Sequence, residues 1–353
     1  MAEHPQNKPR PGRSDSAGDT RAGKSSTRAR KGTVSEKIRR NPRTVAWGLA
    51  ATGLGAVGAG IVGGAAAPEA AGELAAAEPQ APQEFTVVSD WDIEKTKNDK
   101  VDFFIEFLMG KNRDKTQLWL ERLGHYGPMI QQKLAERGMP QDLIWLATIE
   151  SGLDPNAYSK ADAAGLWQFI EETAKRHGLE VSEFVDERRD PVAATDAALD
   201  YLKALNDRFG GSWYLSAAGY NTGENRVERI VKQFGGGRFG EESVYWDISR
   251  HLPSETRDYV PVMLAMGHIG KNPEQYGFTN LQKQQPLTYD EVQVPGGVKL
   301  SDVAAASGVD AQQVYDLNPH LVKKQTPPGR EMTVRIPVDS SDRFEANFAG
   351  RLG

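Results

Sequence analysis

Between residues 97 and 280, apolar side chains recur every three or four residues rather than every second residue. This spacing places them on one face of an α-helix, whereas a half-buried strand requires strict alternation. Two runs show it clearly: Val101, Phe104, Ile105 and Leu108, and then Leu143, Leu146 and Ala147, with Glu150 at the next position of the same face. We therefore predict an all-α domain over residues 97–280.

Capping residues mark where several of these helices begin and end. Asp190 followed by Pro191 combines an N-cap aspartate with proline in the first helical turn, where the missing N–H costs nothing. Ser212 is suited to cap a second helix. The helices expected from these signals and from apolar spacing are 192–209, 212–221 and 255–269.

After residue 286 the pattern changes. Alternating side chains lead into Pro295-Gly296-Gly297, which is typical of a strand followed by a turn. The elements expected here are a strand at 291–294, helices at 300–306 and 311–317, and a closing strand at 333–337. We therefore predict a small β-α-α-β module over residues 286–340.

The first 44 residues are basic and contain almost no large apolar side chain. They hold twelve Lys or Arg against four Asp or Glu, whereas the whole chain has a formal net charge of −5, so the remainder is acidic. Such a segment buries too little apolar surface to fold, and we predict that residues 1–44 are a disordered tail. A basic tail fits either a nucleic-acid contact or the cytoplasmic flank of a membrane segment.

An uncharged run of 23 residues, 45–67, follows the tail and decides between these alternatives. Its length suits an apolar helix that crosses a bilayer, and the basic flank would stay in the cytoplasm. We therefore expect an inner-membrane anchor, a periplasmic body and no nucleic-acid partner. Because seven glycines weaken the run as an anchor, two alternatives are cleavage as a signal segment after Ala67 or Ala77 and a Gly/Ala linker outside the membrane. Residues 68–96, rich in Ala, Pro and Glu, are expected to be a linker.

The chain contains no cysteine, which excludes disulfides, thiolate metal sites and a thiol nucleophile. Its six histidines lack the spacing of metal ligands, so we expect neither a metal nor a cofactor. Seven Trp and ten Tyr supply flat surfaces that suit sugar rings.

Glu150 is the strongest candidate for a catalytic residue. It falls on the apolar face of the helix predicted over 143–150, in its last turn, and Gly152 ends that helix. Apolar neighbours and the partial negative charge of a helix C-terminus disfavour ionisation, so we expect a raised pKa for Glu150. A carboxyl group that keeps its proton near neutral pH can act as a general acid. The alternative is a glutamate exposed at a frayed helix end.

Four short motifs in sequence order give Glu150 a context. They are Glu150-Ser151; Ser159 with Ala164-Gly165-Leu166-Trp167-Gln168-Phe169; Ala218-Gly219-Tyr220-Asn221-Thr222-Gly223; and Glu255-Thr256-Arg257-Asp258-Tyr259-Val260. Each motif is weak alone, but the ordered set resembles the family-1 lytic transglycosylases over about residues 97–280. The resemblance implies a mainly α fold, with a lysozyme-like helical catalytic domain preceding the β-α-α-β module.

The resemblance also assigns roles to individual residues. Glu150 matches the single catalytic acid/base, and six further residues match positions that bind or place the sugar: Ser151, Ser159, Gln168, Tyr220, Asn221 and Tyr259. Each of the six has a structural alternative: a cap for the serines and Asn221, a solvated position for Gln168, and core packing for the tyrosines. Trp167 stands where the motif has Met and could alter how a sugar stacks, whereas Gly219 stands for Ala and is expected to be tolerated.

The implied reaction cleaves the MurNAc-β-1,4-GlcNAc bond of peptidoglycan without water and leaves 1,6-anhydro-MurNAc ends. Glu150 would act as general acid and then as base, while the acetamido oxygen of the substrate replaces a second carboxylate. Goose-type lysozymes share the fold and hydrolyse the bond, but their aspartate two places after the Gly-Leu-Met-Gln motif is Ile170 here. Asp154, within Asp154-Pro155-Asn156, is expected to be a turn residue. The sequence therefore favours transglycosylation over hydrolysis.

The C-terminal module resembles a LysM domain, a glycan-binding unit, through residues 314–319 and the strand that ends at Pro337. It has Gly296-Gly297-Val298 where the usual Gly-Asp-Thr turn would stand, so glycan binding and a purely structural role are both open. The expected partners are peptidoglycan glycan strands. A catalytically silent wall-binding protein is the competing class, and the retained Glu150 argues against it.

Overall fold

The computed structural model of the 353-residue chain describes residues 85–87 and 90–348. The predicted tail (1–44), the apolar run (45–67) and most of the predicted linker (68–96) lie outside the described residues. Within the described part, no helix has both the length and the apolar character needed to cross a membrane. The described residues all fall within one compact unit.

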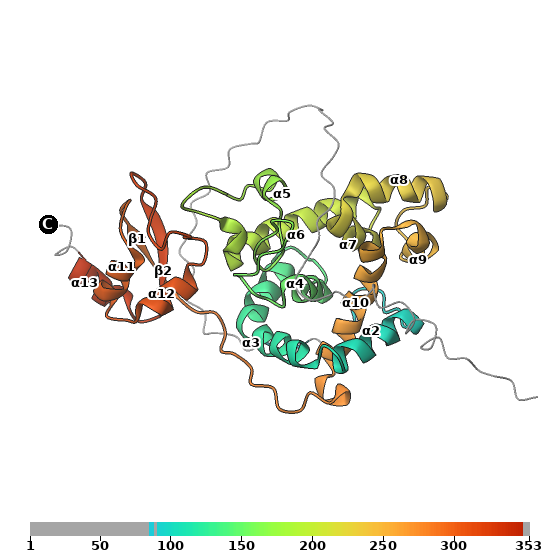
Figure 1. Ribbon diagram of the computed structural model, residues 1–353, viewed down its shortest axis with the longest axis horizontal. Helices are drawn as coiled ribbons and strands as arrows, with labels where there is room; N and C mark the ends of the chain where they lie inside the picture. Colours follow the sequence, from blue (N-terminus) through green and yellow to red (C-terminus); the bar gives the residue numbers. More distant parts are fainter. Residues whose placement is uncertain (1–84, 88–89, 349–353) are drawn as a thin grey trace, which may run out of the picture. The chain divides into compact units, whose positions relative to one another are not determined.

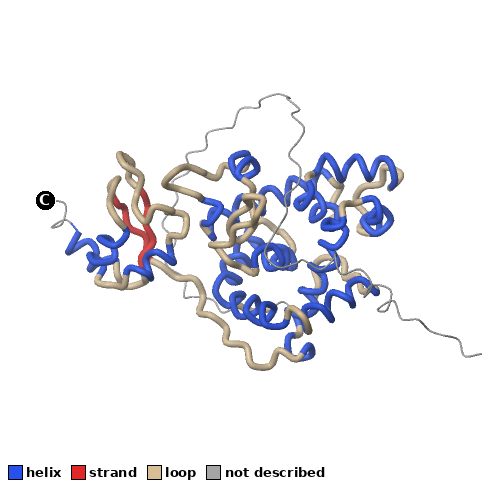
Figure 2. The backbone as a smooth tube through the Cα atoms, viewed as in Figure 1, coloured by secondary structure: helices blue, strands red, loops and turns tan. Residues whose placement is uncertain are grey.

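Helices make up nearly all the regular structure from residue 99 to residue 276 (Figure 2). This confirms the prediction of a mainly helical fold. The helices are α2 (Asp99–Met109), α3 (Arg113–Glu136), α4 (Ile144–Ser151), α5 (Glu171–Arg176), α6 (Pro191–Arg208), α7 (Trp213–Thr222), α8 (Glu224–Phe234), α9 (Ser243–Ile248) and α10 (Ser254–Lys271). Short 3-10 turns lie at η1 (Gln141–Leu143), η2 (Glu187–Arg189), η3 (Ser249–His251) and η4 (Pro273–Tyr276).

The capping signals act as predicted. The Asp190 side chain accepts hydrogen bonds from the backbone N–H groups of Val192 and Ala193 at the start of α6. The Ser212 hydroxyl accepts from the N–H of Leu215 at the start of α7. Each cap satisfies donors that a helix N-terminus otherwise leaves unpaired, which explains why both helices begin within one residue of the predicted position.

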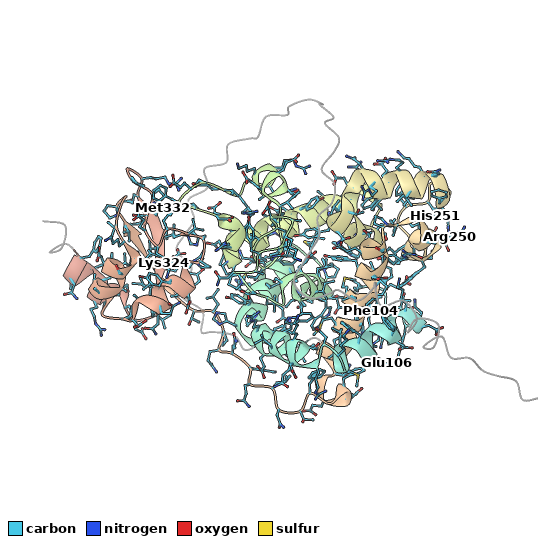
Figure 3. The ribbon with its side chains drawn as sticks, in the orientation of Figure 1. Phe104, Glu106, Arg250, His251, Lys324 and Met332 are labelled. Carbon is cyan, nitrogen blue, oxygen red and sulfur yellow. The ribbon has the colours of Figure 1, made fainter. Side chains whose placement is uncertain are left out.

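Helix α10 is the central element of the helical domain. Nearly all its side chains from Thr256 to Gly270 are buried, and it packs against α2, α4 and α7 (Figure 1). Close approach requires small residues: a Cβ on Gly270 would lie 2.3 Å from the Trp145 ring of α4. Helix α2 is buried on one face only, in contrast to α10. Its Phe104 is buried and its Glu106 is exposed, as expected for an amphipathic surface helix (Figure 3).

The C-terminal module has the predicted β-α-α-β order. It comprises β1 (Asp290–Val294), α11 (Leu300–Ser307), α12 (Ala311–Leu317) and β2 (Met332–Ile336), followed by α13 (Ser341–Phe348). The strands pair antiparallel, with Val292 opposite Val334, and their apolar faces form a separate core with α11 and α12. Helix α13 was not predicted; its Phe344 and Phe348 also join this core.

Part of the predicted linker belongs to the helical domain. Residues 90–96 form no helix or strand, but Phe85 and Ile93 are both buried in its core. A Cβ on Gly127 of α3 would lie 2.3 Å from the Phe85 ring, which shows how closely this segment packs.

Candidate active site

Glu150 lies in the last turn of α4, as predicted. Every other residue of this helix is buried, so the position of Glu150 is fixed by its neighbours on both sides. Gly152 ends the helix in the left-handed conformation, with φ of 65°, and its N–H donates to the carbonyl of Thr148. A Cβ here would lie 2.0 Å from Nε1 of Trp119, so the turn after Glu150 requires glycine for two independent reasons.

Burial raises the pKa of Glu150 to about 8. A hydrogen bond from the Tyr259 hydroxyl opposes this shift, because it stabilises the ionised form, and the negative charge of Glu255 adds to it. The prediction of a raised pKa is therefore confirmed, and the largest cause is desolvation, as expected from the apolar neighbours. At neutral pH the Glu150 carboxyl holds its proton and can donate it.

Two tyrosine hydroxyls lie close to this carboxyl group. Tyr259 of α10 is buried and donates a hydrogen bond to Oε1 of Glu150. Tyr220 of α7 donates to the carbonyl oxygen of Trp167 at 2.8 Å. Burial, followed by the nearby charge of Glu150, raises the pKa of both tyrosines well above the usual value, so both are neutral hydrogen-bond donors.

The loop that carries the second motif, which we call the active-site loop (residues 157–169), is attached directly to the end of α4. The buried Ser151 hydroxyl donates to the carbonyl of Leu166 at 2.8 Å and accepts from the N–H of Asp154. Because Ser151 adjoins Glu150, this bond fixes the loop relative to the carboxyl group. Asp154 accepts from the N–H of Asn156, which agrees with its predicted place in a turn.

Within the active-site loop, Ser159 and Gln168 both bond to the loop itself. The Ser159 hydroxyl accepts from the N–H groups of Ala161 and Ala163. Gln168 has a φ of 50°, unusual for a residue other than glycine, and its Nε2 donates to the carbonyl of Gly165 at 2.9 Å. Gln168 remains partly exposed, whereas Ser159 is buried and its hydroxyl accepts only from this loop among the hydrogen bonds of the described residues.

The two departures from the motifs have different consequences than expected. Trp167 is fully buried and its Nε1 donates to the hydroxyl of Thr195, so the expectation that it alters sugar stacking is wrong. Its bulk fills the core beneath the loop instead. Gly219 packs closely against Phe209: a Cβ there would lie 2.7 Å from the ring, so an alanine would require the ring to shift.

Asn221 joins two helices of the site. Its Oδ1 accepts a hydrogen bond from the Thr256 hydroxyl at 2.8 Å, which links the end of α7 to the first turn of α10. In this structure the side chain therefore braces the helices that present Tyr220 and Tyr259.

Two contributing residues were not singled out from the sequence. Glu255 lies four residues before Tyr259 on α10, so helical spacing placed it on the same face and could have identified it. Arg188 is buried and donates to two carbonyls of the active-site loop, that of Asp162 near the middle of the loop and that of Phe169 at its end. No local pattern links Arg188 to that loop.

Across the described residues, no cluster of three or more His, Asp or Glu side chains could hold a metal ion.

Two known protein families match parts of this chain. Residues 128–241 match the transglycosylase SLT domain family, and residues 288–349 match the family described as the LysM-like domain of lytic transglycosylase MltD. Two parts of the chain are therefore similar, in this order, to a transglycosylase SLT domain and to an MltD-type LysM-like domain, which agrees with the resemblance predicted from its motifs.

Individual proteins are similar to parts of the chain. The chain is 33% identical over 220 residues to membrane-bound lytic murein transglycosylase D of Escherichia coli K12, and the match covers 62% of this chain and 48% of the relative. It is 36% identical over 104 residues to peptidoglycan transglycosylase gp16 of Escherichia phage T7, covering 29% and 8%. The solved 70 kDa soluble lytic transglycosylase Slt70 of Escherichia coli shares 21% identity over 54% of this chain and 34% of its own, with a TM-score of 0.38. The chain therefore spans about half the length of the first relative.

Proposed function

We propose that this protein is a peptidoglycan lytic transglycosylase that cleaves the MurNAc-β-1,4-GlcNAc bond and forms 1,6-anhydro-MurNAc ends. The observation that carries the proposal is the Glu150 carboxyl at the end of α4, hydrogen-bonded to Tyr259 in surroundings that raise its pKa. The relatives supply the substrate class, because their names specify murein or peptidoglycan.

In the first step Glu150 donates its proton to the glycosidic oxygen, and the bond to C1 of MurNAc breaks. Positive charge develops at C1, where the acetamido oxygen of the same sugar can share it, so no second carboxylate is required. Gln168 is the partly exposed amide of the active-site loop and is suited to hydrogen-bond the sugar.

In the second step the Glu150 carboxylate removes the proton from the C6 hydroxyl of the same sugar. The C6 oxygen attacks C1, closes the 1,6-anhydro ring and restores protonated Glu150. Because nucleophile and electrophile belong to one sugar, the attack is intramolecular and needs no bound water. The Tyr259 hydroxyl stabilises the carboxylate between the two steps, since hydrogen bonding favours the ionised form.

Hydrolysis is the second candidate, and one observation favours it. The charge of Glu255 acts on Glu150, so a second carboxylate lies near the acid. Most hydrolytic glycosidases use two carboxylates, one on each side of the glycosidic bond. Glu255 would then orient a water molecule instead of only raising the pKa of Glu150.

The products distinguish these two reactions. Purified protein spanning residues 85–353 is expected to release fragments from peptidoglycan sacculi that end in 1,6-anhydromuramic acid. Mass spectrometry identifies them, because each is 18 Da (one water) lighter than the corresponding hydrolytic product. Ordinary reducing ends as the main product would contradict the transglycosylase proposal and support hydrolysis.

The pH dependence of the reaction is expected to follow Glu150. Because the first step needs the protonated acid, kcat/KM should fall as pH rises through about 8. Tyr259→Phe removes the hydrogen bond that lowers the pKa of Glu150, so the fall in kcat/KM should move to higher pH. Glu255→Gln removes a like charge and should move it to lower pH. Profiles measured on soluble glycan strands test this; shifts of the same sign in both variants would contradict it.

We also place the protein in the bacterial cell envelope, with its catalytic domain in the periplasm. Residues 45–67 would hold it in the inner membrane, or would be removed as a signal segment and release it. A substrate in the cell wall and the membrane-bound relative support this location.

A further inference from the structure

The LysM-like module is attached to the segment that precedes α6. Val185 and Leu321 form an isolated antiparallel β-bridge, in which the N–H of Asp186 donates to the carbonyl of His320 at 2.9 Å. The N–H of Val322 donates in turn to the carbonyl of Phe184 at 3.1 Å. Val185 is fully buried and belongs to the hydrophobic core of the module rather than to that of the helical domain.

A buried charge pair reinforces this attachment. Nη1 of Arg335, on β2, lies 2.9 Å from Oδ2 of Asp190, and both side chains are almost fully buried. Asp190 is also the N-cap of α6, so one carboxylate binds the module and starts a helix of the SLT domain. His320 lies 3.2 Å from the same oxygen, but burial lowers its pKa, and the charge of Asp190 is therefore balanced mainly by Arg335.

The same segment is attached to the active-site loop by Arg188. Its guanidinium binds both oxygens of Asp186 at 2.8 Å and donates to the carbonyls of Asp162 and Phe169. The fork geometry of arginine allows these four bonds at once. The backbone fits as closely as the side chain, since a Cβ on Gly165 would lie 1.7 Å from the carbonyl oxygen of Arg188.

We infer that the LysM-like module is a positioning element of the active site, and that it acts through residues 184–190 on the active-site loop. Asp186 joins the two halves of this connection, because its N–H bonds the module and its carboxylate bonds Arg188. Leu166 and Trp167 of the loop then bond Ser151 and Tyr220 beside Glu150. The module would therefore contribute to catalysis by fixing this loop, whether or not it binds glycan. The inference rests on the proposed function only for its activity readout.

The experiment weakens the buried attachment without leaving an unpaired charge. The double variant Asp190→Asn with Arg335→Met removes both charges, and asparagine still caps α6. The matched control is Arg330→Met, because Arg330 pairs with Glu180 at 2.9 Å between the same two parts of the chain but in an exposed position. Exposed pairs contribute little, so the control should behave as the unaltered protein. Val185→Ala, which trims the apolar contact, tests the same connection if the double variant does not fold.

Hydrogen exchange followed by mass spectrometry supplies the first readout. The N–H groups of Ala164, Gly165 and Gln168 are hydrogen-bonded within the active-site loop. In the double variant they should exchange at least about tenfold faster, while protection in α10 stays unchanged. Faster exchange in β1 and β2 with an unchanged active-site loop would overturn the inference.

Kinetics on soluble glycan strands supply the second readout. A displaced loop should lower kcat by about 10- to 100-fold and change KM less, because the main loss is in positioning. Arg335→Lys, which keeps the charge, should retain more of this kcat than the double variant. An unchanged kcat in a variant whose loop exchanges faster would also overturn the inference. If the unaltered protein cleaves no glycan, the proposed function fails, and hydrogen exchange alone decides whether the module holds the loop.

Discussion

Replacing Glu150 by glutamine is expected to lower the rate of glycan cleavage by at least about 1,000-fold. The amide has nearly the shape of the carboxyl group but can neither donate the proton in the first step nor remove one in the second. Both steps depend on this one side chain, so the loss should lie at the upper end of the range for a single acid/base residue. The release of 1,6-anhydro products, quantified by mass spectrometry, measures it.

The same variant is expected to be more stable than the unaltered protein at alkaline pH. The folded protein holds the Glu150 proton up to about pH 8, whereas the unfolded chain loses it near 4.5. The free energy of unfolding contributed by this group is therefore fully present below pH 4.5 and is lost as pH rises to about 8. Glutamine removes that loss, so the Tm advantage of the variant should grow across this window.

An exposed glutamate provides the control for both measurements. Glu106 lies on the outer face of α2 (Figure 3), so Glu106→Gln should change neither the cleavage rate nor the pH dependence of Tm. Retained cleavage in Glu150→Gln would contradict the catalytic assignment. A constant Tm difference between pH 5 and pH 8 would contradict the buried, protonated state of the carboxyl group.

Much of the fold could be predicted because its signals are local. The N-caps Asp190 and Ser212 act within three residues of their own positions, and alternation in 291–294 reports a strand with one buried face. Helix α13 was missed because it is only eight residues long and has a single pair of large apolar residues, Phe344 and Phe348, to indicate it. Phe85 was assigned to a linker because its contact with Gly127 is distant in sequence.

In the candidate site, too, local features could be predicted and contacts distant in sequence could not. The raised pKa of Glu150 could be predicted from its place on one short helix. Glu255 could have been predicted too, because it lies four residues before Tyr259 on the same helix. Arg188 could not be predicted, because its partners Asp162 and Phe169 lie 26 and 19 residues away and share no motif with it. The burial of Trp167 likewise depends on Thr195 of α6, which comes close only in the folded chain.

Gly165→Ala is expected to destabilise the protein by about 4 kcal/mol or more, which lowers Tm by about 10 °C. Two costs combine at this position. Its φ of 80° lies in the left-handed region, where an L side chain is unfavourable by about 1–2 kcal/mol. In addition, the new methyl group would lie 1.7 Å from the carbonyl oxygen of Arg188, so one of the two backbones must move. Calorimetry measures the change.

Gly178 allows the two costs to be separated. Its φ of 81° is nearly the same, but a Cβ there would meet no atom within 4 Å, so Gly178→Ala should show the conformational cost alone. The difference in Tm between the two alanine variants then measures the close approach of the active-site loop to Arg188. A shift of the Gly165 backbone disturbs the carbonyl that Gln168 bonds. Gly165→Ala should therefore also lower kcat, whereas Gly178→Ala should not. Equal losses of Tm in both variants would mean that the loop adapts freely, and that Arg188 does not fix its position.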